Sequence, residues 1–184
     1  MDNWGIYNYV KAKKGGGSGD NSTLDALIDR SLTSISDNRV TSIGTNTFNG
    51  CTSLVSVVFP NVVSARNGAF SGCTSLTSVD LPLLTSANGN AFNGCTSLTN
   101  IDLKSVTELY SRAFVGCTNL AILILRANQV CTLSNADAFS NTPIANGTGY
   151  IYVPDNLVND YKAATNWAVY EDQIKGLSQL PEGE

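Results

Sequence analysis

The sequence predicts a solenoid in which short coils of chain stack on one another and pair through parallel strands. Three observations support this prediction. One motif returns at a fixed period of 22 residues, and each copy leads into an alternating apolar segment typical of a strand. Ser, Thr and Asn supply 56 of the 184 residues, whereas charged residues make up only 14%. Small neutral polar side chains suit turns and strand edges better than helix surfaces.

The repeated motif reads Phe-x-Gly-Cys-Thr-x-Leu. Complete copies begin at Phe48, Phe70, Phe92 and Phe114, and a degenerate fifth copy begins at Phe139, 25 residues after the fourth. The glycine of each copy is expected in a left-handed turn, and the fifth copy replaces it by Asn141, the next most tolerant residue there. We expect the five phenylalanines to stack as a buried aromatic spine.

The segment after each motif has the pattern L-x-x-L-x-L, which is the strand of a leucine-rich repeat. The return half of each unit carries a second pair of apolar residues, so each coil has two inward faces and is not stable alone. Stacking coils about 4.8 Å apart joins these faces into one core. The strand residues expected inside are Leu54, Val57, Phe59, Leu76, Val79, Leu81, Leu98, Ile101, Leu103, Leu120, Leu123 and Leu125, and the return pairs are Val40 and Ile43, Val62 and Ala65, Leu84 and Ala87, Val106 and Leu109, and Val130 and Leu133.

The predicted fold class is therefore a leucine-rich repeat solenoid, α/β-type and mainly parallel β, of about five 22-residue rungs with helical caps at both ends. The repeat domain is predicted over 22–180, with a cap helix over 22–31, repeats over 32–154 and a C-terminal helical cap over 155–180. The first cap helix follows from the capping-box spacing of Ser22 to Asp25.

The C-terminal cap is expected to follow a last strand over 150–154, with Ile151 and Val153 pointing inward. Asp155 is then expected to cap a helix that runs through Tyr161. A second helical segment is expected to present Trp167, Tyr170 and Ile174 to the stack.

The first 14 residues stand apart from the repeats, since a flexible Gly-rich linker over 15–21 follows them. They contain Trp4, Ile6, Tyr7 and Tyr9, which are too apolar for a simple tail but too few to fold alone. Two interpretations stay open: a docking arm and a disordered start.

The unit from Ala69 to Pro82, A-F-S-G-C-T-S-L-T-S-V-D-L-P, resembles the BspA-like leucine-rich repeat family of bacterial surface proteins, which also occurs in phage and prophage products. The segment from Tyr152 to Ile174 resembles the closing part of such proteins, so the resemblance covers roughly residues 32–180. It implies adhesion or protein binding and no catalysis. No wall-sorting motif is visible at the C-terminus, which favours a virion-associated role over the usual surface anchor.

Composition excludes several functional classes. The chain has no histidine, which removes Ser-His-Asp and Cys-His catalysis and imidazole-dependent zinc sites. With 15 acidic and 11 basic residues, and no basic cluster beyond Lys11, Lys13 and Lys14, nucleic acid is not an expected partner. No apolar stretch approaches the roughly 18 to 20 residues of a membrane span, and no secretion signal is visible, so membrane insertion is not expected.

Four of the five cysteines share one column of the repeat: Cys51, Cys73, Cys95 and Cys117. We expect them to be reduced and buried, because stacked side chains keep their Cβ atoms farther apart than a disulfide prefers. A metal or redox role is the weaker alternative, since the spacing contains no C-x-x-C element. Cys131 aligns with Thr107, at an outward position, so we expect it to be partly exposed and the first cysteine to be alkylated.

Alternation along the strands predicts an outer sheet face. Its candidate binding residues are Ser78, Asp80, Asn100, Asp102, Ile122, Ile124, Tyr150 and Tyr152, with Ser56 and Val58 at the first rungs. Asp80 and Asp102 lie in one column, where paired acids could hold a cation or raise each other's pKa. Two carboxylates fall short of the six to eight oxygens that calcium takes, and a glycosidase needs a cleft between its acids, so solvated surface aspartates are expected instead.

The two isoleucines and two tyrosines of this set form an apolar cluster, which on a soluble protein indicates a binding or assembly site. The alternative is that the C-terminal helices fold back and cover it. Replacing Tyr152 and Ile124 by serine separates the two: lost binding with preserved stability indicates a site, and lost stability indicates coverage.

Two functions are consistent with these features. In the first, the chain is a non-enzymatic binding or adhesion module whose outer face recognises a protein or glycan, displayed on a virion or cell surface through residues 1–14. In the second, it is a structural decoration subunit, anchored by the same arm and without a ligand of its own. No cofactor and no catalytic residue is expected in either case, and the oligomeric state is not indicated.

Overall fold

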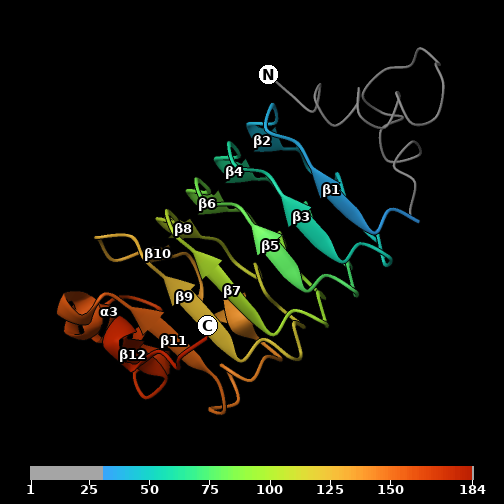
Figure 1. The fold of residues 1–184 in the computed structure, drawn as a ribbon. Helices are drawn as coiled ribbons and strands as arrows, with labels where there is room; N and C mark the ends of the chain where they lie inside the picture. Colours follow the sequence, from blue (N-terminus) through green and yellow to red (C-terminus); the bar gives the residue numbers. More distant parts are fainter. Residues whose placement is uncertain (1–30, 184) are drawn as a thin grey trace.

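The computed structural model describes residues 31–183 of the chain (Figure 1). The predicted arm over 1–14, the linker over 15–21 and all but Ser31 of the predicted first cap helix lie outside the described residues. The statements that follow concern residues 31–183.

One side of the molecule is a row of parallel strands that runs along the whole stack (Figure 1). Their residues pair at an offset of 22, as Ser34 with Ser56, Ser56 with Ser78, and Asn100 with Ile122, so the sequence period is the rung of the fold. The row consists of a three-stranded sheet, β1 (Ser34–Ser36), β3 (Ser56–Val58) and β5 (Ser78–Asp80), and a four-stranded sheet, β7 (Asn100–Leu103), β9 (Ile122–Leu125), β11 (Tyr150–Val153) and β12 (Ile174–Gly176).

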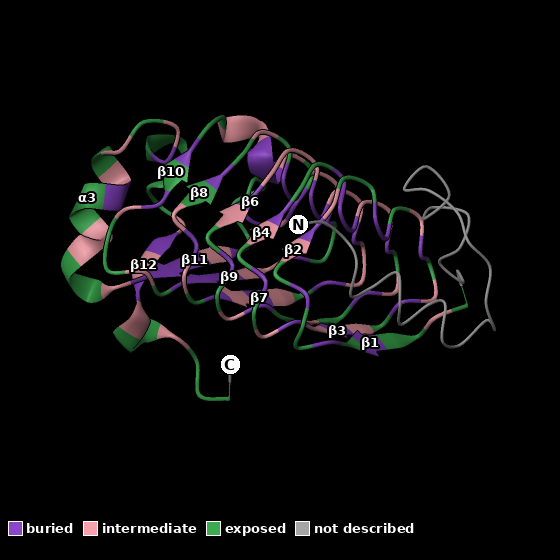
Figure 2. Cartoon of the chain, turned by 90° about the horizontal axis from the view of Figure 1, so that it is seen from above, coloured by how far each residue is buried: buried purple, intermediate pink, exposed green. Residues whose placement is uncertain are grey.

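The return half of each coil forms a second parallel sheet, whose strands have two residues each. Figure 2 shows the two rows with buried residues between them. The second sheet contains β2 (Ser42–Ile43), β4 (Ser64–Ala65), β6 (Ser86–Ala87), β8 (Glu108–Leu109) and β10 (Thr132–Leu133). Each coil therefore buries two apolar stripes against its neighbours, and the predicted solenoid is confirmed.

The aromatic spine is continuous through all five copies of the motif. Neighbouring rings stack almost parallel with centroids 5.2, 5.2, 5.3 and 5.7 Å apart from Phe48 to Phe139. The four motif glycines have φ between 69° and 72°, and Asn141 takes their place at φ 61°. The predicted aromatic spine and the predicted left-handed turn are both confirmed. The turn is occupied by glycine and asparagine, which tolerate a left-handed backbone.

The cysteine column is buried and, among the described residues, forms no disulfide, as predicted. The thiols of Cys73 and Cys117 donate to the carbonyl oxygens of Phe48 and Phe92 at 3.0 Å, and Cys95 donates to Phe70 at 3.2 Å. Each bond crosses to the preceding coil. A cysteine at this position therefore fills the space of a small apolar residue and also donates a second hydrogen bond to a carbonyl that already accepts one from the backbone.

The prediction that Cys131 is partly exposed is wrong, since this residue is completely buried. It does lie in the column of Thr107, because Thr132 pairs with Glu108. However, the Cys131 N–H donates to the Tyr161 hydroxyl at 2.9 Å, and its carbonyl accepts from Trp167 Nε1 at 2.6 Å. The C-terminal cap thus covers the last coil at a position that is open in earlier coils.

The cap contains one α-helix within the described residues, α3 (Val158–Ala163), and several 3-10 turns. The predicted contribution of Tyr161, Trp167 and Tyr170 is confirmed, and Tyr170 meets the Phe139 ring edge-on at 5.5 Å. The 3-10 segments are η2 (Ala136–Phe139), η3 (Asp155–Leu157), η4 (Ala168–Tyr170) and η5 (Leu177–Gln179).

Two details of the predicted cap are wrong. Ile174 belongs to strand β12, which pairs with β11 through Ile151, so Tyr150–Val153 is not the last strand. Asp155 does not cap a helix; its carboxylate accepts hydrogen bonds from the backbone N–H and the hydroxyl of Ser178. The open edge of β11 offers unpaired backbone groups, and pairing with them outweighs a helical continuation here. In residues 31–183, none of the helices has the length and apolar character to cross a membrane.

Candidate binding face

The candidate site is the outer face of the strand row, turned toward the viewer in Figure 1. Ser78 and Asp80 of β5 are exposed, and Asn100 and Asp102 of β7 are half-buried, as are Ile122 of β9 and Tyr150 of β11. Strand pairing places Asn100, Ile122 and Tyr150 in one column, and Asp102, Ile124 and Tyr152 in the next. The structure therefore brings the predicted residues together on one surface.

The prediction that Ile124 and Tyr152 are exposed is wrong, since they are only 2% and 3% accessible. Neither belongs to the continuous hydrophobic core between the two sheets, so their cover lies on the outer side. The C-terminal segment after β12 overlaps β11 and β9 in the view of Figure 1, but Figure 2 shows it running away from the sheet on the outer side. The burial of these two residues agrees with the coverage alternative.

The acidic column is partly neutralised by a residue that the sequence analysis missed. Arg126 Nε donates to both carboxylate oxygens of Asp102, at 2.8 and 3.0 Å. The pair is about one third exposed, so solvent screens it and its contribution to stability is small. Arg126 lies two residues after Ile124, and Ile124 pairs with Asp102. Alternation along the strand therefore predicts that Arg126 lies on the same face as Asp102.

Nothing at this face resembles a metal site. Within residues 31–183, no group of three or more His, Cys, Asp or Glu side chains is placed to hold a metal ion. Asp80 lies at the matching position of β5, 22 residues before Asp102. Asp80 is exposed, whereas Asp102 is paired with Arg126.

The aromatic end of the face carries a second missed residue, Lys175. Its Nζ lies 3.6 Å from the centroid of the Tyr150 ring, in a cation–π contact. The Tyr150 and Tyr152 rings are 6.4 Å apart. Lys175 faces Tyr152 in the register of β12 and β11, so only knowledge of strand β12 would have placed it here.

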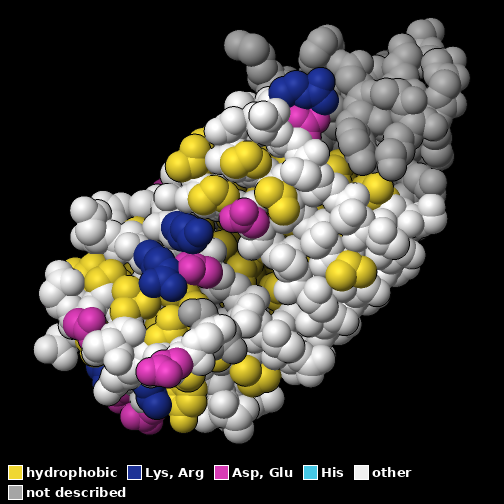
Figure 3. Space-filling view, viewed as in Figure 1, with side chains coloured by type: hydrophobic (Ala, Val, Ile, Leu, Met, Phe, Trp, Pro, Cys, Tyr) yellow, Lys and Arg dark blue, Asp and Glu magenta, His cyan; other side chains and the backbone are white. Residues whose placement is uncertain are grey.

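Charge is distributed unevenly over this surface. In Figure 3, which has the view of Figure 1, the basic and acidic side chains lie toward the carboxyl ends of the strands, and the opposite part is almost uncharged. The uncharged part contains the Ser- and Thr-rich turns of the motif. The face thus combines charged, small polar and apolar groups in separate areas.

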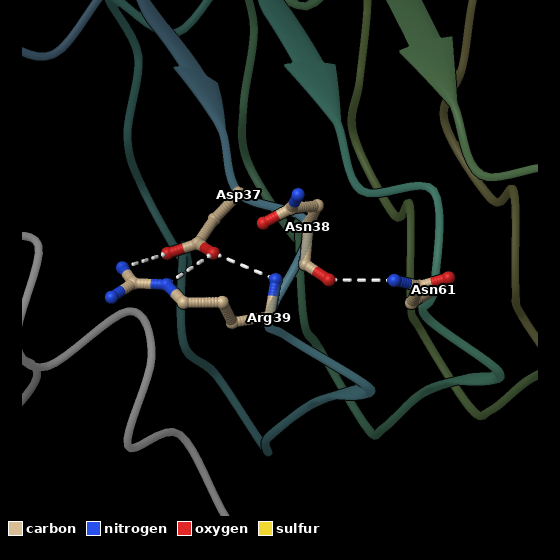
Figure 4. A network of polar contacts seen from close by, with 4 residues as sticks. All are labelled: Asp37, Asn38, Arg39 and Asn61. Carbon is tan, nitrogen blue, oxygen red and sulfur yellow. Dashed lines mark hydrogen bonds and ion pairs between the residues drawn. The ribbon is translucent and has the colours of Figure 1, made fainter.

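A polar network at the first rung has a local structural role. The Asp37 carboxylate accepts from the backbone N–H, Nε and Nη2 of Arg39 at 2.8, 3.0 and 2.7 Å, and the Asn38 carbonyl accepts from Asn61 of the next coil (Figure 4). The Arg39 hydrogen bonds hold the pKa of Asp37 below its ordinary value. These contacts fix the turn after β1 and connect it to the following coil.

Comparison with known proteins agrees with this architecture. Residues 26–146 match the family described as BspA type leucine rich repeat region, in six copies. The match covers more than half of the sequence, so the chain belongs to the BspA-type leucine-rich repeat family. No individually curated protein matches the chain.

Three solved structures show the same fold. A leucine-rich repeat protein of T. pallidum is 25% identical with a TM-score of 0.57, over 68% of this chain and 61% of its own. A leucine-rich cell surface protein of Faecalibacterium prausnitzii is 26% identical, with a TM-score of 0.58 over 77% and 35%. A leucine-rich repeat protein from Bacteroides ovatus is 30% identical, with a TM-score of 0.56 over 78% and 34%. The chain thus spans between about one third and three fifths of the length of these relatives.

Proposed function

We propose that this protein is a non-enzymatic binding module, and that the outer face of the strand row recognises a protein or a glycan. The observation that carries the proposal is the face itself. Side chains of different chemistry, from Ser78 to Tyr150, stand in ordered columns on a sheet whose other side is a continuous core.

The arrangement suits recognition more than catalysis. Its ordered groups are a carboxylate and guanidinium pair, an amide, an isoleucine and a tyrosine, which make hydrogen bonds and apolar contacts with a partner. Parallel pairing on both sides holds β9 and β11 in place, and β7 pairs with β9, so these side chains lose little freedom when a partner binds.

Membership of a family of bacterial surface-protein type supports display outside the cell. The F. prausnitzii relative is described as a cell surface protein, and this chain shares its repeat fold. We therefore place the binding face on a bacterial surface or a virion.

The test uses two lysine substitutions on opposite sheets. The full-length protein, labelled with a fluorophore, is applied to an array of mammalian and bacterial glycans and to a panel of immobilised human extracellular proteins. Ile122→Lys alters the outer face at β9, and Ser86→Lys is the matched control on β6 of the other sheet; both positions are half-buried.

We expect reproducible binding to a member of the array or panel that Ile122→Lys weakens at least tenfold and Ser86→Lys leaves within twofold. Circular dichroism and thermal unfolding of both variants verify that they fold. Equal effects of the two substitutions, or a larger effect of Ser86→Lys, would contradict the proposal.

A further inference from the structure

The sequence contains five Asn-Gly pairs, and the first four, at 49–50, 67–68, 88–89 and 93–94, lie in the repeated coils. An asparagine that precedes glycine can lose its amide without an enzyme, because glycine has no side chain to hinder ring closure between the two residues. The nitrogen that closes the ring is the glycine amide. A hydrogen bond from this N–H to another part of the fold holds the nitrogen away from the asparagine side chain, so the fold determines which pairs react.

Three of the four pairs are protected by bonds between coils. The N–H groups of Gly50, Gly68 and Gly94 donate to carbonyl oxygens of the next coil, at 2.7, 3.0 and 2.8 Å. In two of these pairs the asparagine amide is also held, since Asn49 and Asn93 donate to the side chains of asparagines three residues earlier. These glycine nitrogens become available only when the coils separate, which requires a large part of the global free energy of unfolding.

The pair Asn88–Gly89 lies in the turn after β6 and lacks this protection. The turn is closed by the Ala91 N–H, which donates to the Asn88 carbonyl at 3.0 Å. In contrast, the Gly89 N–H has no hydrogen-bond partner among residues 31–183, and neither has the side-chain amide of Asn88. Both residues are half-buried, so water reaches the turn. The attacking nitrogen and the amide that it attacks are therefore both free while the coil stays folded.

We infer that Asn88 is a site of spontaneous deamidation in the folded protein. The Gly89 nitrogen attacks Cγ of Asn88, so that a new N–Cγ bond closes a five-membered succinimide and the Cγ–Nδ2 bond breaks. The Asn88 amide nitrogen leaves as ammonia and takes up the proton of the Gly89 N–H. Water then adds to one of the two ring carbonyls and opens the ring to aspartate or isoaspartate. The inference goes beyond the proposed function, since this turn follows the second sheet and is not part of the outer face.

Isoaspartate at position 88 alters the coil, because the main chain then runs through the side-chain carbons and is one atom longer. The carbonyl that accepts from the Ala91 N–H leaves the main chain as a free carboxylate. Phe92 follows four residues later and stacks on Phe70 and Phe114 at 5.2 and 5.3 Å. We expect this product to destabilise the stack, whereas aspartate preserves the length of the main chain.

The test measures the four sites in one protein. The full chain is incubated at pH 7.4 and 37 °C for several weeks and digested with trypsin at mildly acidic pH, and deamidation is located by mass spectrometry. The tryptic peptide 67–104 contains Asn67, Asn88 and Asn93 together. We expect Asn88 to react at least tenfold faster than the other three sites of the coils. In guanidinium-unfolded protein the four rates are expected to agree within threefold, because the protecting bonds are absent.

Gly89→Ala is the matched variant. Gly89 does not have a left-handed backbone, and an added Cβ would lie 3.5 Å from the Ser111 carbonyl oxygen and 3.7 Å from Asn67 Oδ1, which are ordinary contact distances. We expect this variant to fold like the wild type and to deamidate at Asn88 at least fivefold more slowly. Asn88→Asp, which carries the charge without the longer main chain, is expected to unfold at the wild-type denaturant midpoint. Aged protein that contains isoaspartate is expected to unfold at a lower midpoint.

Equal rates at the four sites of the folded protein would overturn the inference, as would a faster reaction at Asn49, Asn67 or Asn93. An unchanged rate at Asn88 in folded Gly89→Ala would also overturn it. If Gly89→Ala does not fold, the comparison of the four sites in folded and unfolded wild-type protein still gives the answer. None of these measurements involves a binding partner, so their outcome is independent of the array experiment.

Discussion

At the scale of single residues, the buried thiols make the stability of the stack depend on pH. Burial raises the pKa of Cys73 and of Cys131 to about 12 in each case. An exposed thiol in an unfolded chain has a pKa of about 8.5. Below pH 8 both states keep these protons; between about pH 9 and pH 12 the unfolded chain releases them and the folded chain does not. The free energy of unfolding therefore falls as the pH rises through this range.

Cys131→Ala tests this coupling. Between pH 9.5 and 11, urea unfolding is expected to lose stability less steeply in the variant, by about 1.4 kcal/mol per pH unit, because one proton fewer is released. The measured quantity is the slope of the free energy of unfolding against pH. A loss of stability from the missing sulfur that is the same at every pH does not change this slope. Parallel stability curves for the variant and the wild type would contradict the assigned burial of this thiol.

A shared residue type made one left-handed column of the coil predictable, whereas a second left-handed column has no single residue type. Gly50, Gly72, Gly94 and Gly116 share a residue type, so their turn was predictable, and Asn141 at φ 61° extends it. A second column at the same period contains Asn46, Gly68, Asn90 and Arg112, all with φ between 56° and 63°. Two of its members are asparagine, one is glycine and one is arginine, and at Gly68 an added Cβ would lie 2.2 Å from Asn46 Oδ1. A backbone requirement met by three residue types leaves a weaker pattern in the sequence than one met by glycine alone.

At the scale of elements, the C-terminal cap ends the stack by satisfying the last coil. Trp167 donates to the Cys131 carbonyl, the Tyr161 hydroxyl accepts from the Cys131 N–H, and the Tyr170 hydroxyl donates to Ala136. Trp167 and Tyr170 also continue the aromatic spine beyond Phe139. Three aromatic side chains thus take over both the polar and the apolar contacts that another coil would make.

Tyr161→Phe separates the polar part of this role from packing. Loss of the hydroxyl leaves the buried Cys131 N–H without its acceptor, so we expect the free energy of unfolding to fall by about 1–3 kcal/mol. Tyr150→Phe, on the half-buried outer face, is the matched control and is expected to change stability by less than about 0.5 kcal/mol. Equal losses in guanidinium unfolding would show that the hydroxyl bond is unimportant.

The sequence predicts the position of the cap but not all its elements. Tyr161, Trp167 and Tyr170 were recognisable because large aromatic residues at helical spacing rarely stay exposed. Strand β12 was not recognisable, since Ile174–Gly176 has three residues and becomes a strand only through the open edge of β11. The burial of Ile124 and Tyr152 did not follow from alternation along the strands, which places both residues on the outer face.

At the scale of the whole molecule, one repeated coil builds both the core and the surface. The inward positions of each coil repeat closely, and the outer positions change from serine to aspartate, isoleucine and tyrosine along the stack. Core residues are constrained by the coils above and below, whereas outer residues do not pack against this core. The fold therefore depends on register: each coil must contact only its neighbours, with like positions superposed.

Deletion of one complete period tests this claim most directly. Removing residues 77–98 joins Leu76 to Thr99, which restores the order Leu-Thr-polar-apolar of the original junction. Removing residues 77–87 deletes half a coil and is the control. In guanidinium unfolding, we expect the 22-residue deletion to give a protein that unfolds cooperatively at a lower denaturant midpoint, and the 11-residue deletion to give none. Cooperative unfolding of both proteins, or of neither, would contradict a stack of interchangeable coils.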